Sequence, residues 1–361
     1  RWFESTLLYQ KMTKEKKIKP SKELPLGFVD RQEKELLIRD FVISNIKEVM
    51  IKYGFQYLET PSFEYTDSIG KFLPDKDRPD QGVFSFKDEK NCLSLRYDLT
   101  APLARYVAKN YLELPKPFKR YQLGTVWRNE KPGPGRFREF LQFDADFIGT
   151  KNLMADAELC VMISEILEKC GLDKKDYTIK WSTRKLTDAL FEKLKISSSN
   201  KRLKILRSLD KLDRLGWDEV KKLLGKGRKD KSGDFTEGAE LSSSQIQDVY
   251  EIFVKKEVIP SGDNYEEGAG KDIRSMTNFL DVFGFKNYKF DPSIIRGLEY
   301  YTGPVFEVNL NFEVKNSKGK TIQFGSIGGG GRYDNLVSNF GNFDCPATGI
   351  SIGLDRLVFA L

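Results

Sequence analysis

Histidine is the most conspicuous absence from this sequence. None of its 361 residues is a histidine. Imidazole supplies the general base of hydrolase triads and is the commonest nitrogen ligand of zinc in proteins. The chain is therefore excluded from those classes. Any catalysis must use carboxylates, arginines, lysines, tyrosines or a bound metal ion.

Cysteines and long apolar runs are also scarce. The four cysteines, at positions 92, 160, 170 and 345, form no CxxC pair and no metal-finger spacing, which favours free thiols in a reducing compartment. No run of about 18 apolar residues exists, so we expect no transmembrane helix and no membrane partner. The net charge of +7 is a mild basic excess, and a polyanionic partner and a lysine-rich composition explain it equally well.

The first residues do not resemble the start of a natural chain. Residue 1 is an arginine, and Met12 opens a lysine-rich stretch. We expect residues 1–18 to form a flexible leader, with Met12 as the natural start and a cloning remnant before it. A processed presequence is the alternative, because the leader mixes apolar and basic residues.

Apolar periodicity predicts alternating helices and strands in the first half of the chain. Helices are expected over residues 30–53, 100–109 and 155–170, with Gly54 and Gly171 ending the first and the last. Strands are expected over residues 55–63, interrupted by Pro61, and over residues 120–128 and 137–148, which flank a loop at 129–136. Residues 82–95 are typical of a hairpin, and residues 71–80 of a polar loop.

The character of the sequence changes between Thr183 and Phe283, where charged helical segments dominate. We interpret this stretch as an inserted, mostly helical module with a polar loop at residues 225–238. Further strands are then predicted at residues 288–290, 305–312 and 321–327, a helix at 332–340, and a strand running into a helix at 348–357.

One candidate site lies in residues 296–307. The guanidinium group of Arg296 would bind a phosphate or carboxylate bidentately. Tyr300 and Tyr301 would supply flat walls and hydroxyl groups. Because successive strand side chains face opposite ways, only some of these residues can line one pocket. The residues alone fit either an anion-plus-aromatic site or a core strand with a surface arginine.

A second candidate site lies in residues 126–146. Four residues share one face of its second strand if the alternation holds: Phe140, Gln142, Asp144 and Asp146. Arg128 and Arg138 would reach the same space from either side of the hairpin. An aromatic platform, an amide, carboxylates and guanidinium groups together suit an adenylating site. A solvent-facing hairpin with alternating charges is the alternative.

Five segments, in this order along the chain, resemble the histidyl-tRNA synthetase family of class II aminoacyl-tRNA synthetases. They are residues 53–61 (motif 1), 95–102 (substrate-binding loop), 126–146 (motif 2), 296–307 (histidine-specific motif) and 349–357 (motif 3). The resemblance covers residues 19–361, and residues 130–136 and 212–238 look most like the α-proteobacterial branch.

This resemblance implies an α+β fold with an antiparallel sheet flanked by helices. It divides the chain into catalytic parts at residues 19–182 and 285–361 around an inserted helical module at residues 183–284. It also implies a cytoplasmic homodimer formed through motif 1, with a mitochondrial location as the alternative. Family members continue into an anticodon-binding domain, which we expect to be absent here.

The resemblance also assigns roles to single residues. The catalytic candidates are Arg128, on the α-phosphate of ATP, and Arg296, between that phosphate and the substrate carboxylate. The remaining ATP-site candidates are Glu130, also a possible Mg²⁺ ligand, Arg138, Phe140 stacked on adenine, and Arg356 over its other face. The histidine-binding candidates are Asp98, Thr100, Gln142, Asp146, Tyr300 and Tyr301.

The segment at residues 328–334, which begins with four glycines, has two interpretations. In the family it lines the amino-acid pocket, where missing side chains let the backbone approach a ligand. The alternative is a permissive turn before a helix. Asp98 and Asp146 stand where family members can have the longer glutamate, which shortens their expected reach.

The implied reaction needs no histidine in the enzyme. Histidine and ATP would give histidyl-adenylate and pyrophosphate, and the acyl group would then move to the 3′ end of tRNA(His). The attacking carboxylate is already ionised at pH 7, so alignment and charge neutralisation by arginines and Mg²⁺ suffice. The alternative is a non-catalytic, synthetase-like regulatory subunit of ATP phosphoribosyltransferase. The presence of Arg128, Gln142, Arg296, Tyr300 and Tyr301 favours the active enzyme.

Overall fold

The computed structural model describes residues 21–70, 82–133, 135–229, 233–256, 267–295, 300–315, 319, 321–322, 325–341 and 343–361. The predicted leader at residues 1–18, the loop at 71–80 and Arg296 lie outside these described residues.

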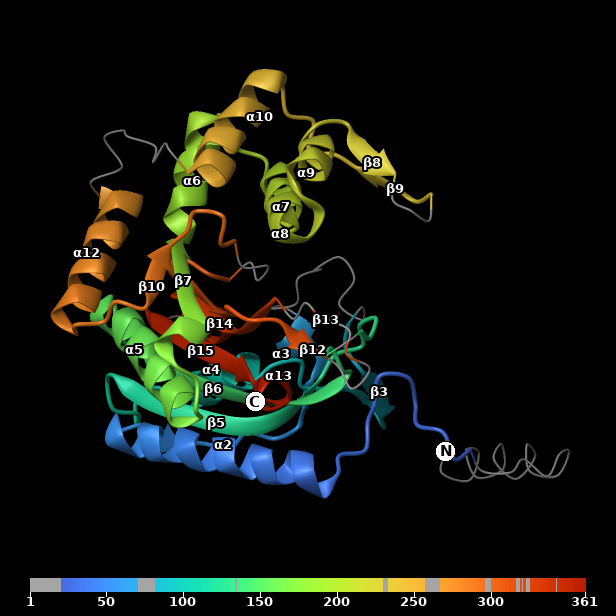
Figure 1. Ribbon diagram of the computed structural model, residues 1–361, viewed down its shortest axis with the longest axis vertical. Helices are drawn as coiled ribbons and strands as arrows, with labels where there is room; N and C mark the ends of the chain where they lie inside the picture. Colours follow the sequence, from blue (N-terminus) through green and yellow to red (C-terminus); the bar gives the residue numbers. More distant parts are fainter. Residues whose placement is uncertain are drawn as a thin grey trace, which may run out of the picture.

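An eight-stranded sheet forms the centre of the fold (Figure 1). Its order is β1 (Gln56–Tyr57), β5 (Phe118–Trp127), β6 (Glu139–Ile148), β15 (Ala347–Gly353), β14 (Ser326–Arg332), β11 (Pro304–Leu310), β7 (Tyr177–Thr183) and β10 (Tyr288–Phe290). The short edge strands β1 and β10 pair parallel with their neighbours, and all other pairs are antiparallel. The predicted α+β fold with an antiparallel sheet is confirmed.

Helices cover one face of this sheet. They are α2 (Glu33–Lys52), α5 (Met154–Lys169), α12 (Ala269–Val282) and α13 (Leu354–Ala360), and Figure 1 shows α2 running beneath the strands. Phe143, Ala145 and Phe147 of β6 point into the hydrophobic cluster under these helices. Because side chains alternate along a strand, Gln142 and Asp146 face the other way. The alternation predicted for residues 140–146 is therefore confirmed.

Smaller elements flank the opposite face. Helix α4 (Thr100–Lys109) and the 3₁₀ turn η3 (Val337–Phe340) share a second hydrophobic cluster. Beside them are α3 (Thr66–Gly70) and a three-stranded sheet of β2 (Phe63–Tyr65), β4 (Asn91–Leu95) and β3 (Ser85–Asp88). The hairpin predicted at residues 82–95 is confirmed as β3 and β4. The interruption predicted at Pro61 in the strand at residues 55–63 is confirmed, because this stretch holds β1 and the start of β2 on either side of the proline.

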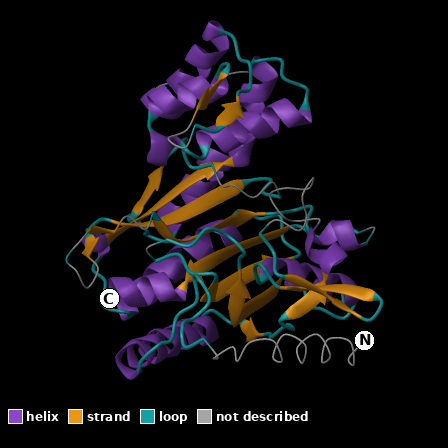
Figure 2. Cartoon of the chain, turned by 90° about the vertical axis from the view of Figure 1, so that its right-hand side faces the viewer, coloured by secondary structure: helices purple, strands orange, loops and turns teal. Residues whose placement is uncertain are grey.

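Between β7 and β10 the chain leaves the sheet and forms helices with their own hydrophobic cluster. They are α6 (Arg184–Lys193), α7 (Ser199–Leu209), α8 (Leu212–Leu215), α9 (Trp217–Leu224), α10 (Ser243–Tyr250) and the π-helical turn η2 (Glu251–Lys255). Figure 2 shows most of them gathered above the sheet. The module boundaries at residues 183 and 284 stay a prediction.

Three local predictions were wrong. Residues 225–238 are not only a loop, because β8 (Gly227–Lys229) and β9 (Phe235–Glu237) pair there antiparallel. The helix at 332–340 is only η3, because β14 continues through Arg332. The strand at 321–327 is broken into β13 (Thr321–Ile322), which pairs with β12 (Val314–Lys315), and the start of β14. The remaining element is the 3₁₀ turn η1 (Lys174–Asp176).

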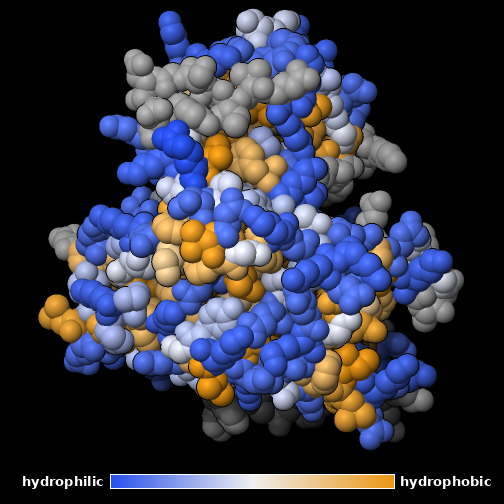
Figure 3. All heavy atoms as spheres, turned by 60° about the vertical axis from the view of Figure 1, so that its left-hand side comes forward, coloured by the Kyte–Doolittle hydropathy of each residue, from blue (hydrophilic) through white to orange (hydrophobic). Residues whose placement is uncertain are grey.

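Most of the surface seen in Figure 3 is hydrophilic, and its apolar side chains form separate patches. In the part of the chain that the structure describes, no helix is long and apolar enough to cross a bilayer.

Candidate active site

A cavity of about 310 Å³ lies on the sheet face opposite α2 and α5. Ten predicted site residues line it: Asp98, Thr100, Arg128, Glu130, Phe140, Gln142, Asp146, Tyr300, Tyr301 and Arg356. The two candidate segments thus meet at one place. Tyr300 and Tyr301 both line the cavity because they precede β11, so strand alternation does not separate them. Arg296 lies outside the described residues, and its role stays a prediction.

The floor of one end of the cavity is a network of buried polar groups. The Asp146 carboxylate accepts a hydrogen bond from the Tyr333 hydroxyl at 2.5 Å. Its other oxygen lies 3.1 Å from Nη2 of Arg120, a fully buried guanidinium on β5. Gln142 donates through Nε2 to Asp144 at 2.7 Å. These contacts hold the amide and both carboxylates in fixed positions.

This end of the cavity has more buried negative than positive groups. Burial raises the pKa values of Asp98 and Asp146. Burial and the neighbouring Asp146 carboxylate also raise the pKa of Asp144, while Arg120 opposes the rise. Three buried carboxyl groups thus lie around the Arg120 guanidinium, and Arg128 also opposes the rise in the pKa of Asp98. Such a pocket favours a ligand that brings its own cation, because an added positive charge stabilises the ionised carboxylates.

The other end of the cavity is built around Arg128. Its guanidinium lies 4.4 Å from the ring centroid of Tyr97 and 5.2 Å from that of Phe140. Glu130 accepts from the Tyr97 hydroxyl at 2.5 Å and pairs with Arg136. Burial alone would raise the pKa of Glu130, but the Tyr97 hydroxyl, Arg136 and Arg128 together hold that pKa below its usual value.

Two further arginines belong to this end in different ways. Arg356 lines the cavity and donates through Nη1 to the Ser326 carbonyl oxygen at 2.8 Å. Arg138 is not among the lining residues. Its Nε donates to the Glu130 carbonyl oxygen at 3.0 Å, and its backbone N–H donates to the Gly27 carbonyl oxygen at 2.8 Å. In this structure Arg138 holds the loop after β5, and its ATP-binding role stays a prediction.

Glycines allow the close approach of strands around the cavity. A Cβ atom on Gly349 would lie 1.9 Å from Oδ1 of Asp146, and one on Gly331 would lie 2.9 Å from Cδ1 of Tyr301. The glycine run is part of β14, with Gly328, Gly329 and Gly330 in the cavity wall. The interpretation as a turn before a helix was therefore wrong, and the pocket-lining interpretation agrees with the geometry.

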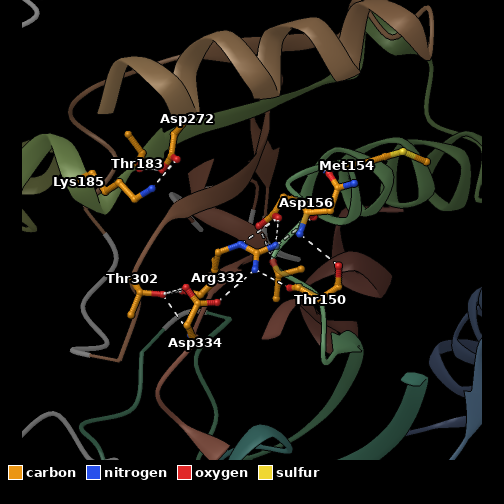
Figure 4. Close-up of polar contacts among 11 residues, drawn as sticks. Thr150, Met154, Asp156, Thr183, Lys185, Asp272, Thr302, Arg332 and Asp334 are labelled. Atoms are coloured by element: carbon orange, nitrogen blue, oxygen red, sulfur yellow. Dashed lines mark hydrogen bonds and ion pairs between the residues drawn. The ribbon is translucent and has the colours of Figure 1, made fainter. Parts of the chain in front are cut away.

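A buried ion pair anchors the tyrosine-bearing segment (Figure 4). Arg332 at the end of β14 pairs with Asp156 on α5 and donates to the Thr150 carbonyl oxygen at 2.8 Å. Asp334 accepts from Nη1 of Arg332 at 3.2 Å and from the Thr302 hydroxyl at 2.9 Å. Thr302 directly follows Tyr301. The cavity wall is thus tied to the helix layer on the far side of the sheet.

Sequence reasoning missed several residues of the site. Tyr333 was assigned to a helix, although it follows the glycine run directly and its hydroxyl reaches Asp146. Arg120, Tyr97 and Arg136 were not singled out. Arg120 could have been found from the pairing of the two predicted strands, because the β5–β6 register places Arg120 directly opposite Asp146.

The carboxylates do not form a dedicated metal site. Among the described residues, no group of three acidic, cysteine or histidine side chains is placed to hold an ion. Both carboxylate oxygens of Glu130 already accept from Tyr97 and Arg136. A Mg²⁺ ion needs only one or two protein carboxylates when phosphate oxygens supply other ligands. The described carboxylates therefore supply too few free oxygens to hold a resident ion by themselves.

An antiparallel sheet with the motif 2 hairpin, the glycine strand and the motif 3 strand–helix unit around one cavity defines the catalytic domain of a class II aminoacyl-tRNA synthetase. A family profile described as histidyl-tRNA synthetase matches residues 27–357. The chain belongs to the histidyl-tRNA synthetase family.

Named relatives agree with this assignment. The chain is 49% identical to a histidine–tRNA ligase of Bartonella quintana, over 96% of this chain and 73% of the relative. It is also 49% identical to a histidine–tRNA ligase of Brucella ovis, over 94% and 70% of the two chains. The predicted likeness to the α-proteobacterial branch is confirmed.

Solved structures show the same fold. A histidyl-tRNA synthetase from Nostoc sp. PCC 7120 superimposes with a TM-score of 0.73 at 26% identity, over 94% of this chain and 75% of that one. A protein from Bacillus halodurans described as an ATP phosphoribosyltransferase regulatory subunit/histidyl-tRNA synthetase gives 0.73 at 24% identity, over 95% and 84%. The second likeness concerns the fold alone.

Proposed function

We propose that this chain is a histidine–tRNA ligase that activates histidine with ATP and transfers it to the 3′ end of tRNA(His). The observation that carries this proposal is the polarity of the cavity described above. Asp98 and Asp146 line one end, with the buried Asp144 and Arg120 next to Asp146, and three arginines, Arg128, Arg136 and Arg356, line the other end. A zwitterionic amino acid with a basic side chain fits the first end, and a triphosphate fits the second.

In the amino-acid end, Asp98 and Thr100 would hold the ammonium group, while Gln142, Asp146 and Tyr300 would surround the imidazole. Asp98 is already oriented, because its Oδ1 accepts from the backbone N–H groups of Thr100 and Ala101 at 3.2 and 2.9 Å. A substrate without the polar ring would leave buried groups unpaired. Sites of this kind discriminate by about 10⁴-fold or more.

In the nucleotide end, Arg128 would neutralise charge on the α-phosphate while Phe140 and Arg356 enclose the adenine. Mg²⁺, when bound with ATP, would offset further phosphate charge. The histidine carboxylate is the nucleophile and is ionised at neutral pH, so no side chain has to remove a proton. Positioning and electrostatic stabilisation are the whole contribution of the protein.

Histidine-dependent ATP–pyrophosphate exchange tests this function directly. We expect exchange that requires histidine, is not supported by phenylalanine or glutamine, and collapses in an Arg296→Ala variant. Aminoacylation of tRNA(His), with other tRNAs as controls, tests the second step. A folded chain that binds ATP but shows no exchange would contradict the proposal. The regulatory subunit of ATP phosphoribosyltransferase is the alternative, but the 49% identity to named ligases does not favour it.

We further propose that the chain forms a homodimer through the surface next to motif 1. Phe63 on β2 and Phe86 on β3 are 51% and 44% exposed and pack edge to face at 5.4 Å. Tyr65, on the same small sheet, is 57% exposed, and Tyr57 on β1 in motif 1 is 50% exposed. Apolar groups clustered on one exposed face mark an interface more often than scattered ones do. A second copy would bury them.

Analytical ultracentrifugation checks this assembly. The unmodified chain is expected to sediment as a dimer, and a Phe63→Ser/Phe86→Ser double variant as a monomer. Leu112→Ser is the matched control, because Leu112 is 93% exposed and lies outside this surface. A monomeric unmodified chain at micromolar concentration, or a double variant that stays dimeric, would show that this surface is not the interface.

A further inference from the structure

Tyr97 has no role in the function proposed above, yet the segment that carries it is fixed by several hydrogen bonds. The residue before it, Arg96, donates through its backbone N–H to the Ser62 carbonyl oxygen at 2.9 Å and accepts from the Trp127 N–H at 3.1 Å. The buried Arg96 guanidinium also donates to the Thr125 carbonyl oxygen at 2.7 Å. The segment between β4 and α4 is therefore fixed to the end of β5, where Arg128 follows.

The side chain and carbonyl group of Tyr97 contact both charged residues of the nucleotide end. The ring lies 4.4 Å from the Arg128 guanidinium, and the Tyr97 carbonyl oxygen accepts from Nε of Arg128 at 3.2 Å. The hydroxyl group donates to Oε1 of Glu130 at 2.5 Å. One residue therefore orients a cation through its ring and carbonyl, and an anion through its hydroxyl.

The contacts are directional as well as close. Arg128 lies near the faces of two rings, and Phe140 is the second at 5.2 Å. With Tyr97 in place, the guanidinium is limited to a small set of orientations. The hydroxyl stays a proton donor at neutral pH, because burial raises the pKa of Tyr97 to about 12.

We propose that Tyr97 is a positioning residue for activation. It holds Arg128 and Glu130 in the geometry that receives ATP before the nucleotide binds. This inference rests on the proposed function, in which these two residues contact the nucleotide. Preorganised groups lower the barrier because they need no rearrangement during the reaction.

A purely structural role of Tyr97 would have different effects on stability and on the kinetic constants. Tyr97 also packs against Ile69 and Val83, so the alternative is that its side chain serves only to pack that small hydrophobic cluster. Loss of this packing lowers the unfolding temperature but leaves the KM for ATP of the folded enzyme unchanged. Loss of positioning raises that KM or lowers kcat while the KM for histidine stays the same. A change in the KM for ATP or in kcat, without a change in the KM for histidine, therefore distinguishes positioning from packing.

The test uses pyrophosphate exchange with the full chain and the variants Tyr97→Phe and Tyr97→Leu. Tyr97→Phe keeps the ring and removes the hydroxyl donor to a carboxylate, and we expect the KM for ATP to rise about 10-fold or more. Tyr97→Leu also removes the ring under Arg128, and we expect kcat to fall by a further factor of about 3 to 30. The KM for histidine is expected to stay within about twofold in both.

Tyr177→Phe is the matched control. The Tyr177 hydroxyl also contacts a glutamate, Glu168, at 3.1 Å, but it lies in the main hydrophobic cluster away from the cavity. Its removal is expected to leave both KM values and kcat unchanged. If Tyr97→Leu does not fold, Tyr97→Phe still decides the question, because it keeps the ring that fills the small cluster.

The outcomes are distinct. An unchanged KM for ATP and unchanged kcat in Tyr97→Phe and in any folded Tyr97→Leu would overturn the inference, and so would an equal rise in both KM values. If the unmodified chain shows no exchange at all, the proposed function fails instead. Equilibrium binding of ATP without histidine then tests Tyr97 separately. A weaker affinity in Tyr97→Phe would support its positioning role, and an equal affinity would exclude it.

Discussion

Replacement of Arg128 by alanine is expected to lower kcat for histidine-dependent pyrophosphate exchange by about 10²–10³-fold, the loss typical of one preorganised donor to a developing charge. Arg128 lines the cavity and is held between two aromatic rings at 4.4 and 5.2 Å. No other guanidinium in the described part of the chain is held between the Tyr97 and Phe140 rings. In the proposed function Arg128 contacts the phosphate and not the amino acid, so we expect the affinity for histidine measured by calorimetry to stay the same.

A second stacked arginine supplies the control for this experiment. The Arg202 guanidinium lies 5.2 Å from the Phe191 ring in the helices between β7 and β10, and its Nε donates to a backbone carbonyl oxygen. Arg202→Ala therefore removes a similar stacked group outside the cavity and should leave exchange unchanged. Equal activity of the two variants would show that Arg128 does not stabilise the reaction and would require a different phosphate-binding group.

Strand alternation made much of this site predictable. The pattern over residues 140–146 placed Phe140, Gln142, Asp144 and Asp146 on one face, and all but Asp144 line the cavity. The resemblance to five family motifs supplied Asp98, Tyr300 and Arg356, which the structure brings to the same cavity. These successes depend on local patterns, because residues two apart on a strand share a face whatever the rest of the fold does.

The missed residues depend on partners far away in the sequence. Tyr333 reaches Asp146 across 187 positions, and Tyr97 reaches Glu130 across 33. Neither contact follows from local pattern. The glycine run could not reveal its own strand, because residues without side chains carry no hydrophobic period. Arg120 needed the β5–β6 register, and a slip of one residue would have turned its side chain to the opposite face.

The buried cluster around Arg120 leads to the largest expected effect on stability. Arg120→Met removes the guanidinium that lies 3.1 Å from the Asp146 carboxylate and leaves buried carboxyl groups without a compensating cation. Removing one partner of a buried pair typically costs about 3–5 kcal/mol. We expect the midpoint of urea-induced unfolding at pH 8 to fall accordingly. Lys286→Met is the control, because its ion pair with Asp281 is exposed and should not shift the midpoint.

The loss in Arg120→Met should depend on pH in a defined direction. The pKa values of Asp144 and Asp146 are raised in the folded state by burial, so the folded chain binds protons more tightly than the unfolded chain, whose aspartates titrate near pH 3.9. Stability therefore falls as pH rises above about 4 through the raised values. Without Arg120 these pKa values rise further, so the deficit relative to the unmodified chain should be large at pH 8 and smaller at pH 5. An equal deficit at both pH values would show that Arg120 stabilises the sheet through packing and its 2.9 Å bond to the Leu99 carbonyl oxygen, and not by balancing the carboxylates.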